Sequence, residues 1–422
     1  MKRIIIILTA VLMLVGCVAP QPQAYTDDIT ALNAVTLPKA TKEDDYEAKS
    51  EIRQAVGENQ LAGAMDFAAR SAQAVLSGGD ADENRLYSPM SLYFALAMLA
   101  RTADGETRDQ ILSALQMADE ATLDETASLY RLLYADDAYS RLHLANSAWT
   151  QQGGDIELDF SDKTLDTLAQ KHFAEVFAVD FKSEKTSKAI DDWISKQTNG
   201  LLGSGFTTPD ETLMMLVNTI YFKSEWASRF LEEYTAPANF HNADGSESQC
   251  DFMHKVSSQS FSRTEQYISS SLGLKGGSVR FILPNEGLTP EDILFGSGWA
   301  EVLSEDEGTG FGSVTWQVPK LDYSESVSLN DAAKALGIYD AFDPDLADFT
   351  PLTDSQLFVS SIHQQSTVTM DEKGIEAASY TDIAFAGVSM PLDTAEMILD
   401  RPYIFVIYAE GLPLFIGIVN AL

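Results

Sequence analysis

The sequence predicts a mixed α+β protein in which helices dominate the first half and strands the second half. Apolar residues recur at helical spacing in NQLAGAMDFAARSAQAVL (59–76) and SLYFALAMLARTADGETRDQILSAL (91–115). Runs rich in β-branched and aromatic residues follow, among them LMMLVNTIYFKSEW (213–226) and RPYIFVIYAEGLPLFIGIVNAL (401–422). Because the two kinds of element are largely segregated along the chain, an α+β fold is favoured over repeated βαβ units.

The first residues, MKRIIIILTAVLMLVGC, predict a signal peptide over residues 1–16. Two basic residues precede an apolar run that is too short and wrongly flanked for a membrane-spanning helix. Leu14-Val15-Gly16-Cys17 resembles the bacterial lipobox, which implies cleavage before Cys17 and attachment of lipid to its thiol. Several acyl chains together would hold the protein firmly at a membrane. The alternative is an ordinary secretory signal that happens to end in Cys.

Residues 17–50 are polar, contain scattered prolines and show no sustained period, so they are expected to form a lipidated tether. No internal repeat and no Pro- or Gly-rich break follows, so residues 51–422 are expected to form one domain that is larger than most. Within it, further strands are expected over LHLANSAWTQ (142–151), GGSVRFILPN (276–285), GSVTWQVPKLDY (312–323) and DSQLFVSSIHQQSTVTMDE (354–372).

The chain carries a formal net charge of −35 at pH 7, from 28 basic and 63 acidic residues. Such a charge argues against a nucleic acid or an anionic lipid surface as partner and favours cationic partners. If Cys17 carries lipid, Cys250 is the only other cysteine and no intramolecular disulfide can form. Cys250 lies in the alternating segment SQCDFMHK, which is typical of a strand, so an inert packed thiol is favoured over a nucleophile.

The sequence shows none of the usual signatures of a catalytic or metal site. The five histidines do not form the HExxH pattern of zinc proteases, and no Ser lies in the GxSxG elbow of α/β-hydrolases. The glycine-rich GTGFGS (308–313) lacks the Lys of a phosphate-binding loop, and DPDLADF (343–349) lacks the Gly of a calcium-binding loop. We therefore expect no enzymatic activity, no metal and no cofactor, although a triad assembled from distant residues stays open.

The segment DEKGIEAASYTDIAFAGVSM (371–390) has a different character. Its residues 372–378, Glu-Lys-Gly-Ile-Glu-Ala-Ala, resemble the hinge of the reactive-centre loop of serpins, a family of serine protease inhibitors. Other motifs of that family occur in the family's order: NRLYSPMS (84–91), WISKQTNG (193–200), LVNTIYFK (216–223) with Trp226, VPKL (318–321), RPY (401–403) and LFIG (414–417). The resemblance implies the serpin fold, with three β-sheets, eight or nine helices and an exposed reactive-centre loop.

The hinge and the residues after it alternate in character, as in a strand with one buried side. From Ile375 onward every second side chain is apolar or small: Ile375, Ala377, Ser379, Thr381 and Ile383. The intervening side chains are mostly polar: Glu376, Ala378, Tyr380 and Asp382. Such a segment could enter a sheet with one side buried, yet its small residues also suit a loop outside the sheet. Gly374 permits the torsions of a turn, and Ala377 and Ala378 present no bulk to insertion.

The resemblance implies that the protein is a suicide substrate. A target protease would cleave the loop and stay attached as an acyl-enzyme while the freed loop inserts into the central sheet as a new strand. The native fold would then be held kinetically rather than at its free-energy minimum. The family's usual spacing from hinge residue Glu372 implies cleavage between Val388 and Ser389, with Gly387, Ser389 and Met390 as competing sites. Val388 would fit the small apolar pocket of an elastase-like protease rather than the acidic pocket of trypsin.

The resemblance also assigns Ser88, Ser91, Asn218 and Gln364 to the shutter, where the central sheet opens. The family usually has a His at the position of Gln364, bonded to the residues that match Ser88 and Asn218. Gln can also donate and accept, so the bond is expected to remain without a pH-sensitive charge. Ile375 replaces the usual Thr or Ser of the hinge, and because it is uncharged we expect insertion to survive. Ordinary buried polarity is the alternative interpretation of Ser88, Ser91 and Asn218.

The sequence thus predicts a monomeric, lipid-anchored inhibitor that traps an elastase- or chymotrypsin-like serine protease. We expect it in the bacterial cell envelope, outside the cytoplasm. If the organism has two membranes the outer one is favoured, because Val18 lacks the Asp that retains lipoproteins on inner membranes. Two alternatives stay open: a non-inhibitory serpin whose loop is cut without trapping the protease, and a surface hydrolase on a different fold.

Overall fold

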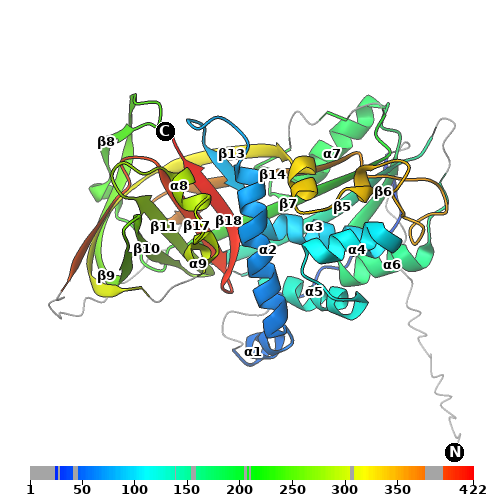
Figure 1. The fold of residues 1–422 in the computed structure, drawn as a ribbon, viewed down its shortest axis with the longest axis horizontal. Coiled ribbons are helices and arrows are strands. Elements are labelled where there is room, and N and C mark those ends of the chain that lie inside the picture. Colours follow the sequence, from blue (N-terminus) through cyan, green and yellow to red (C-terminus); the bar gives the residue numbers. More distant parts are fainter. Residues whose placement is uncertain are drawn as a thin grey trace, which may run out of the picture.

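The computed structural model describes residues 24–26, 29–40, 46–137, 139–153, 158–203, 207–208, 211–304, 308–375 and 393–422. These residues form two nine-stranded sheets and the helices that pack against them (Figure 1). The mixed α+β class is therefore confirmed. The described residues contain ten α-helices: α1 (Tyr46–Gln54), α2 (Glu58–Leu76), α3 (Pro89–Thr102), α4 (Gly105–Ala114), α5 (Glu120–Leu133), α6 (Asp162–Lys171), α7 (Glu184–Gln197), α8 (Pro290–Leu294), α9 (Trp299–Leu303) and α10 (Asn330–Ala335).

The first sheet, which we call the central sheet, mixes parallel and antiparallel pairs. Its order is β1-β2-β6-β5-β7-β15-β14-β13, with β4 paired to β5. β5 and β7 are antiparallel, whereas β7 and β14 are parallel. The strands are β1 (Ala24–Thr26), β2 (Ile29–Ala31), β4 (Ala135–Asp136), β5 (Ser140–Gln151), β6 (Ala174–Val179), β7 (Met214–Glu225), β13 (Leu321–Ser328), β14 (Ser361–Met370) and β15 (Gly374–Ile375).

The second sheet joins what the resemblance implied as two smaller sheets. Its order is β16-β12-β9-β10-β11-β17-β18-β3, with β8 paired to β9. The two parts are continuous because the 17-residue strand β9 pairs with β8 and β12 along most of its length and with β10 at its end. The strands are β3 (Arg85–Tyr87), β8 (Ala236–His241), β9 (Glu247–Arg263), β10 (Tyr267–Leu274), β11 (Gly277–Pro284), β12 (Gly310–Pro319), β16 (Thr394–Ile398), β17 (Tyr403–Ala409) and β18 (Leu412–Val419).

Helix α3 lies at the centre of the molecule and contacts β5 and β7 of one sheet and β18 of the other. It is apolar on nearly all sides, as expected for a fully buried helix. Its start is well defined, because the Ser88 hydroxyl accepts from the N–H of Ser91 at 3.4 Å and Pro89 occupies the first helical position. The motif 84–91 therefore begins a helix that is in contact with both sheets.

Helix α7 covers one face of the central sheet over a separate apolar cluster that includes Trp149, Phe177 and Trp193. The Trp193 indole N–H donates to the carboxylate of Glu175 on β6 at 2.6 Å. Asn199 and Gly200 follow the helix with φ of +54° and +83°, the left-handed conformation that ends helices. The motif 193–200 thus fixes how α7 sits on the sheet and where it stops.

The N-terminal segment 29–40 packs on the edge of the central sheet, although its composition predicted a tether. β2 pairs antiparallel with β6, and Ile29 is buried in the cluster beneath α7. The side chain of Asn33 donates to the carbonyl of Ala174 at 3.0 Å and accepts from the N–H of Val176 at 2.9 Å. The tether prediction is wrong for this segment, because an edge strand needs few apolar residues when backbone and amide groups supply the bonds.

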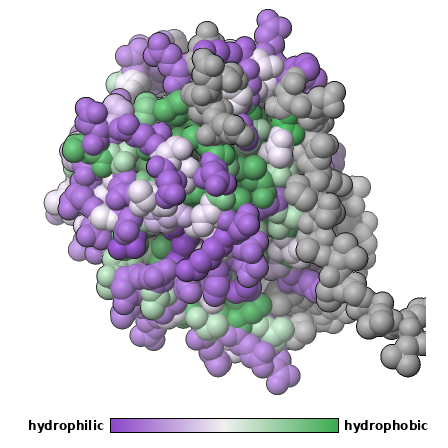
Figure 2. Space-filling view, turned by 90° about the vertical axis from the view of Figure 1, so that its right-hand side faces the viewer, coloured by the Kyte–Doolittle hydropathy of each residue, from purple (hydrophilic) through white to green (hydrophobic). Residues whose placement is uncertain are grey.

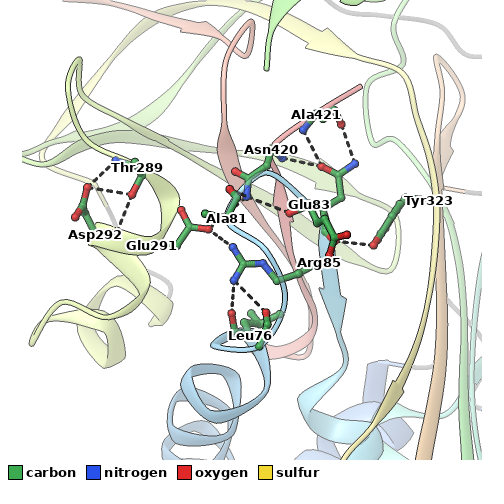
Figure 3. Close-up of polar contacts among 12 residues, drawn as sticks. Leu76, Ala81, Glu83, Arg85, Thr289, Glu291, Asp292, Tyr323, Asn420 and Ala421 are labelled. Atoms are coloured by element: carbon green, nitrogen blue, oxygen red, sulfur yellow. Dashed lines mark hydrogen bonds and ion pairs between the residues drawn. The ribbon is translucent and has the colours of Figure 1, made fainter. Parts of the chain in front are cut away.

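The motif residue Asn84 ties the C-terminal end of the chain to the start of β3. Its Oδ1 accepts from the N–H groups of Asn420 and Ala421, at 2.7 and 2.9 Å. The Tyr323 hydroxyl on β13 donates to the Asn84 carbonyl at 2.7 Å, so the outer strand of the central sheet is held at the same point (Figure 3). Arg85 forms an ion pair with Glu291 beside it (Figure 3).

The end of the molecule near α6 and β6 presents a largely hydrophilic surface, with apolar side chains gathered in smaller patches between polar ones (Figure 2). This agrees with the large excess of acidic over basic residues in the chain. Among the described residues, no helix is both long and apolar enough to cross a membrane.

Candidate functional site: the gate of the central sheet

Strands β7 and β14 are paired along only part of their length. They run parallel, and their described ladder extends from Ser361↔Met215 to Gln365↔Thr219. Beyond that point the ladder gives no pairs between the two strands. We call the stretches 220–223 of β7 and 366–369 of β14 the gate.

The short strand β15 enters the far end of the gate. Ile375 pairs with Ser224 of β7 on one side and with Met370 of β14 on the other, antiparallel to both strands. The chain therefore turns back after β14, and the two residues of β15, Gly374 and Ile375, enter between β14 and β7. The prediction that Ile375 has an inward side chain is confirmed, because it is only 2% exposed.

A tight turn connects β14 to β15. The Asp371 carboxylate accepts from the N–H groups of Lys373 and Gly374, at 2.8 and 3.2 Å, as in an Asx turn. Gly374 packs against β7 so closely that a Cβ atom would clash with the carbonyl oxygen of Ser224 and lie 2.8 Å from the Cα of Glu225. Glycine is therefore required here by space, and its φ of +155° adds to that requirement.

The backbone of the turn is held by residues 226–230, which follow β7 and which we call the gate turn. The Trp226 N–H donates to the carbonyl of Lys373 at 3.0 Å, and its indole N–H donates to the carbonyl of Asp371 at 2.8 Å. The Phe230 N–H donates to the carbonyl of Glu372 at 3.1 Å. Three successive carbonyls of the hinge region are thus bound by one short segment.

The Glu372 side chain is buried between two partners. One carboxylate oxygen lies 3.1 Å from Nζ of Lys320, and the other accepts from the Thr235 hydroxyl at 2.7 Å. Burial alone would raise the pKa of Glu372, but the hydrogen bonds from Thr235 and Lys320 outweigh it and lower the pKa below its ordinary value. Glu372 is therefore held ionised, and it fixes the turn to the residues just before β13 and β8.

At the opposite end of the gate, Gln364 holds β14 to the start of α3. Its Oε1 accepts from the N–H of Ser88 at 2.9 Å, and its Nε2 donates to the carbonyl of Ser88 at 2.9 Å. Gln364 is fully buried, with 0% of its surface exposed. The predicted bond between positions 364 and 88 is therefore present in the structure, and it goes to the backbone of Ser88.

Asn218 pairs with Gln364 in the ladder, but its side chain turns to β5, where its Nδ2 donates to the side-chain oxygen of Asn146. The remaining amide atoms, Oδ1 of Asn218 and Nδ2 of Asn146, are buried without a hydrogen-bond partner among the described residues, as is the hydroxyl of Ser91. Buried polar atoms without partners are costly, so these three atoms lower the stability of the closed sheet in this region.

His363 does not replace the family's His, because successive side chains of a strand point to opposite faces. Gln364 points toward α3, whereas His363 is half-buried on the other face of the sheet. Burial lowers the pKa of His363 below its ordinary value. The position at which the family usually has a titratable His therefore carries a buried amide in this chain, as expected from the sequence.

Several predicted site residues lie outside the described residues: Glu376, Ala377, Ala378, Val388, Ser389 and Cys17. Cys250 is described and is half-buried in β9, as predicted for a strand residue. Desolvation raises the pKa of its thiol. Among the described residues, no group of three or more His, Cys, Asp or Glu side chains is arranged to hold a metal ion.

Sequence reasoning missed three residues of the site as site residues: Trp226, Thr235 and Lys320. Trp226 and Lys320 lie within motifs that were recognised, but their partners are about 50 to 150 residues away in the chain. The alternation of the hinge predicted the inward direction of Ile375 because that signal is local. It could not predict the contacts of Lys320, which depend on how two sheets meet.

The fold and the gate define a class of protein: one that holds the first residues of an additional strand inside its own sheet. The chain belongs to the serpin family, because the family model for serpin (serine protease inhibitor) matches residues 62–422. Members of this family are in general inhibitors of proteases rather than catalysts.

Known relatives support the assignment. The chain is 30% identical to plasminogen activator inhibitor 1 of Neovison vison over 80% of its own length and 86% of the relative. It is 31% identical to Serpin-ZXA of Oryza sativa subsp. japonica, over 86% and 97% of the two chains. Its fold is similar to that of the native thermophilic serpin tengpin, with a TM-score of 0.79 and 25% identity over 93% of this chain and 100% of that one.

Human thyroxine-binding globulin shares the fold, with a TM-score of 0.73 at 22% identity over 85% of this chain and 99% of that one. By its name, that protein binds thyroxine. The fold therefore does not assign a target by itself.

Proposed function

We propose that the protein inhibits a serine protease of elastase or chymotrypsin type by trapping it as an acyl-enzyme. The observation that carries this proposal is the gate: β15 lies between β7 and β14 with the ladder between them unpaired beyond it. A strand that continued from Ile375 in the same register would place residues 376–379 opposite 220–223 and 366–369. Only after that would the closed ladder at Thr219 and Gln365 have to open.

The residues on both sides of the gate suit such a strand. Val368 and Met370 on β14 and Phe222 on β7 are buried, so an entering side chain on their face would be removed from water. The predicted inward residues Ala377 and Ser379 are small and would fit without clashes. Each further residue would add backbone hydrogen bonds on two sides, which supplies the driving force for insertion.

The chemical step belongs to the protease. Its serine hydroxyl attacks the carbonyl carbon of Val388, the peptide bond to Ser389 breaks, and the new amino group of Ser389 leaves with the serine's proton. An ester between the protease and Val388 remains. Insertion of the freed segment then draws the protease across the molecule before water can hydrolyse the ester.

The composition of the loop favours a protease with an apolar primary pocket. No Arg or Lys lies between Gly374 and Arg401, so a trypsin-like protease has no suitable residue in this stretch. Val388 is small and β-branched, which suits elastase best, and the large negative charge of the chain would attract a cationic protease.

We also propose that the protein is a monomeric bacterial lipoprotein with lipid on Cys17. The support is the sequence of residues 1–17, with its basic start, apolar run and Leu-Val-Gly-Cys ending. Growth with a radioactive fatty acid should label the wild type and leave a Cys17→Ala variant unlabelled. Equal labelling of the two would contradict the proposal.

The function is tested with the chain from Val18 onward, which keeps every described residue. It is mixed with pancreatic elastase and with chymotrypsin, and the products are separated on denaturing gels. We expect a covalent complex and a released peptide that starts at Ser389. Val388→Arg is a matched variant that should lose elastase complexes and gain complexes with trypsin.

Two results would change the assignment. Clean cleavage without a complex, with all proteases tried, would favour the non-inhibitory alternative, in which the loop is only a substrate. Labelling of the chain itself by a fluorophosphonate would favour a hydrolase. A complex joined at another bond would keep the function and move the cleavage site to Gly387, Ser389 or Met390.

A further inference from the structure

Lys255 on β9 reaches from the second sheet to the gate turn. Its ammonium group donates to the carbonyl of Ser228 at 2.8 Å. The same group lies 4.4 Å from the centre of the Phe230 ring and 6.0 Å from that of Trp226, distances at which a cation is attracted to an aromatic face. One charged group thus contacts three residues of the gate turn.

The gate turn transmits this contact to the hinge region. Trp226 and Phe230, whose rings face the ammonium group, are the residues whose N–H groups hold the carbonyls of 371–373. Phe230 and Trp226 also pack edge to face, with ring centres 5.8 Å apart. The ammonium group of Lys255 therefore contacts the rings of Trp226 and Phe230, and the N–H groups of the same two residues bind the turn between β14 and β15.

The charge of Lys255 is not neutralised by a nearby carboxylate. Among the described residues no ion pair of Lys255 is present; Glu225 pairs with Arg229 at 2.9 Å, and Glu372 pairs with Lys320 at 3.1 Å. Glu232 and Glu233 of the short helix after the gate turn are exposed to solvent. Burial lowers the pKa of Lys255 to about 8. The charge is therefore held by a carbonyl oxygen and two rings, and it is lost in mildly alkaline solution.

We propose that Lys255 is a positioning residue for loop insertion, whose ammonium group fixes the gate turn and so slows the opening of the gate. This inference rests on the proposed function. With the charge present, Trp226 and Phe230 keep their hydrogen bonds to residues 371–373, and the C-terminal ends of β7 and β14 stay in place on either side of β15. Without it, the aromatic pair loosens and the strands separate more readily.

The test measures entry of a strand directly and needs no protease. A fluorescent peptide with the sequence of residues 375–388 is added to the chain from Val18 onward, and its uptake is followed on native gels between pH 7 and 9.5. Three proteins are compared: wild type, Lys255→Arg, whose charge persists throughout this range, and Lys255→Met, which has none. Lys334→Met is the matched control, because Lys334 lies 5.6 Å from the ring centre of Phe342, away from the gate.

We expect Lys255→Met to take up the peptide roughly fivefold faster than Lys255→Arg at pH 7, the size of an ordinary cation–π contact. Uptake by the wild type should match the Arg variant at pH 7 and rise several-fold with a midpoint near pH 8, whereas the ratio of the two variants stays constant. Carboxylates and guanidinium groups do not titrate in this interval, and the groups around Lys255 are common to all three proteins.

Equal uptake by the Arg and Met variants, or the same pH profile in all three proteins, would overturn the role of Lys255 and leave the proposed function intact. Failure of the peptide to enter any of the proteins would overturn the proposed function and this inference with it. If Lys255→Met does not fold, the wild type and Lys255→Arg still decide the question, because only the wild type can lose its charge between pH 7 and 9.5.

Discussion

Nζ of Lys320 lies 3.1 Å from the carboxylate of Glu372, and this ion pair joins the passage between the two sheets to the turn between β14 and β15. Lys320 is the residue between β12 and β13, so its backbone belongs to the passage from the second sheet into the central sheet. Glu372 lies between β14 and β15. The turn between β14 and β15 is therefore fixed to the passage between the two sheets.

The strength of this pair can be measured with Glu372→Gln, Lys320→Met and the double variant. Because Glu372 is only 6% exposed, loss of either partner leaves a polar group poorly satisfied, and we expect each single variant to lower the free energy of unfolding by about 1–3 kcal/mol. The double variant should lose less than the sum, with a coupling of about 1 kcal/mol, because Lys320 is partly solvated. Urea titrations measure all four proteins, and strict additivity would contradict the contact.

Gly374→Ala should impair formation of covalent complexes more than an alanine substitution at a glycine that has only a positive φ. A Cβ at this position would clash with Ser224, so β15 could not pair with β7 as it does. We expect Gly374→Ala to be cleaved by elastase with few or no covalent complexes. Gly245→Ala is the matched control, because Gly245 has a φ of +84° but nothing within 4 Å of an added Cβ. If the two variants form complexes equally well, steric contact with β7 is not required.

Gln364→Leu should weaken the contact between β14 and α3. The substitution leaves the N–H and the carbonyl of Ser88 without their side-chain partner in a fully buried position, and each such group costs about 1–3 kcal/mol. The neighbouring Gln365 points to the other face and is half-buried, so Gln365→Leu is the matched control. Thermal unfolding should show a loss of several degrees for the first variant and about none for the second. Similar losses would mean that the Ser88 contact has no special role.

His172 should make the native state sensitive to acid. Burial, with the nearby charges of Arg101 and Lys171, lowers the pKa of His172 to about 3, whereas an unfolded chain has a value near 6.5. The unfolded state therefore binds the extra proton between these values, and stability is full above pH 6.5 and falls as the pH drops toward 3. The expected loss at pH 4 from this residue is about 3 kcal/mol.

The measurement for His172 is the free energy of unfolding between pH 7 and 4, for the wild type and His172→Gln. Gln is neutral throughout and can still accept from Nε of Arg101, which lies 3.5 Å from the ring. The difference between the two proteins isolates His172 from the many carboxylates that titrate in the same range. Parallel curves would show that His172 is not buried in the neutral form.

Features that depend on neighbouring residues in the chain could be predicted from the sequence, whereas contacts between residues far apart in the chain could not. The fold class, the strand at Cys250 and the inward side chain of Ile375 were predictable, because each follows from a period of two or 3.6 residues or from a motif. The partner of Gln364 was predictable only through the family resemblance, since Ser88 is 276 residues away. The cleavage site and the lipid on Cys17 stay predictions.

Other features could not be predicted, for identifiable physical reasons. Nothing in the sequence distinguishes Lys255, in the middle of β9, or Lys320, between β12 and β13, from other lysines, and only the packing of the two sheets shows what their charges contact. Segment 29–40 was expected to be a tether because its composition is polar. Edge pairing depends mainly on backbone groups, which are the same in every sequence, and on one amide at Asn33.

The attachment of segment 29–40 to β6 also sets an orientation. Cys17 lies seven residues before Ala24 of β1, so a fully extended chain would span only about 25 Å between them. A lipid on Cys17 would then keep the β1 edge of the central sheet beside the bilayer and leave β13, at the opposite edge, turned toward the surroundings. The lipid would thus hold the protein in one orientation at the membrane, and a target protease would reach it from the β13 side.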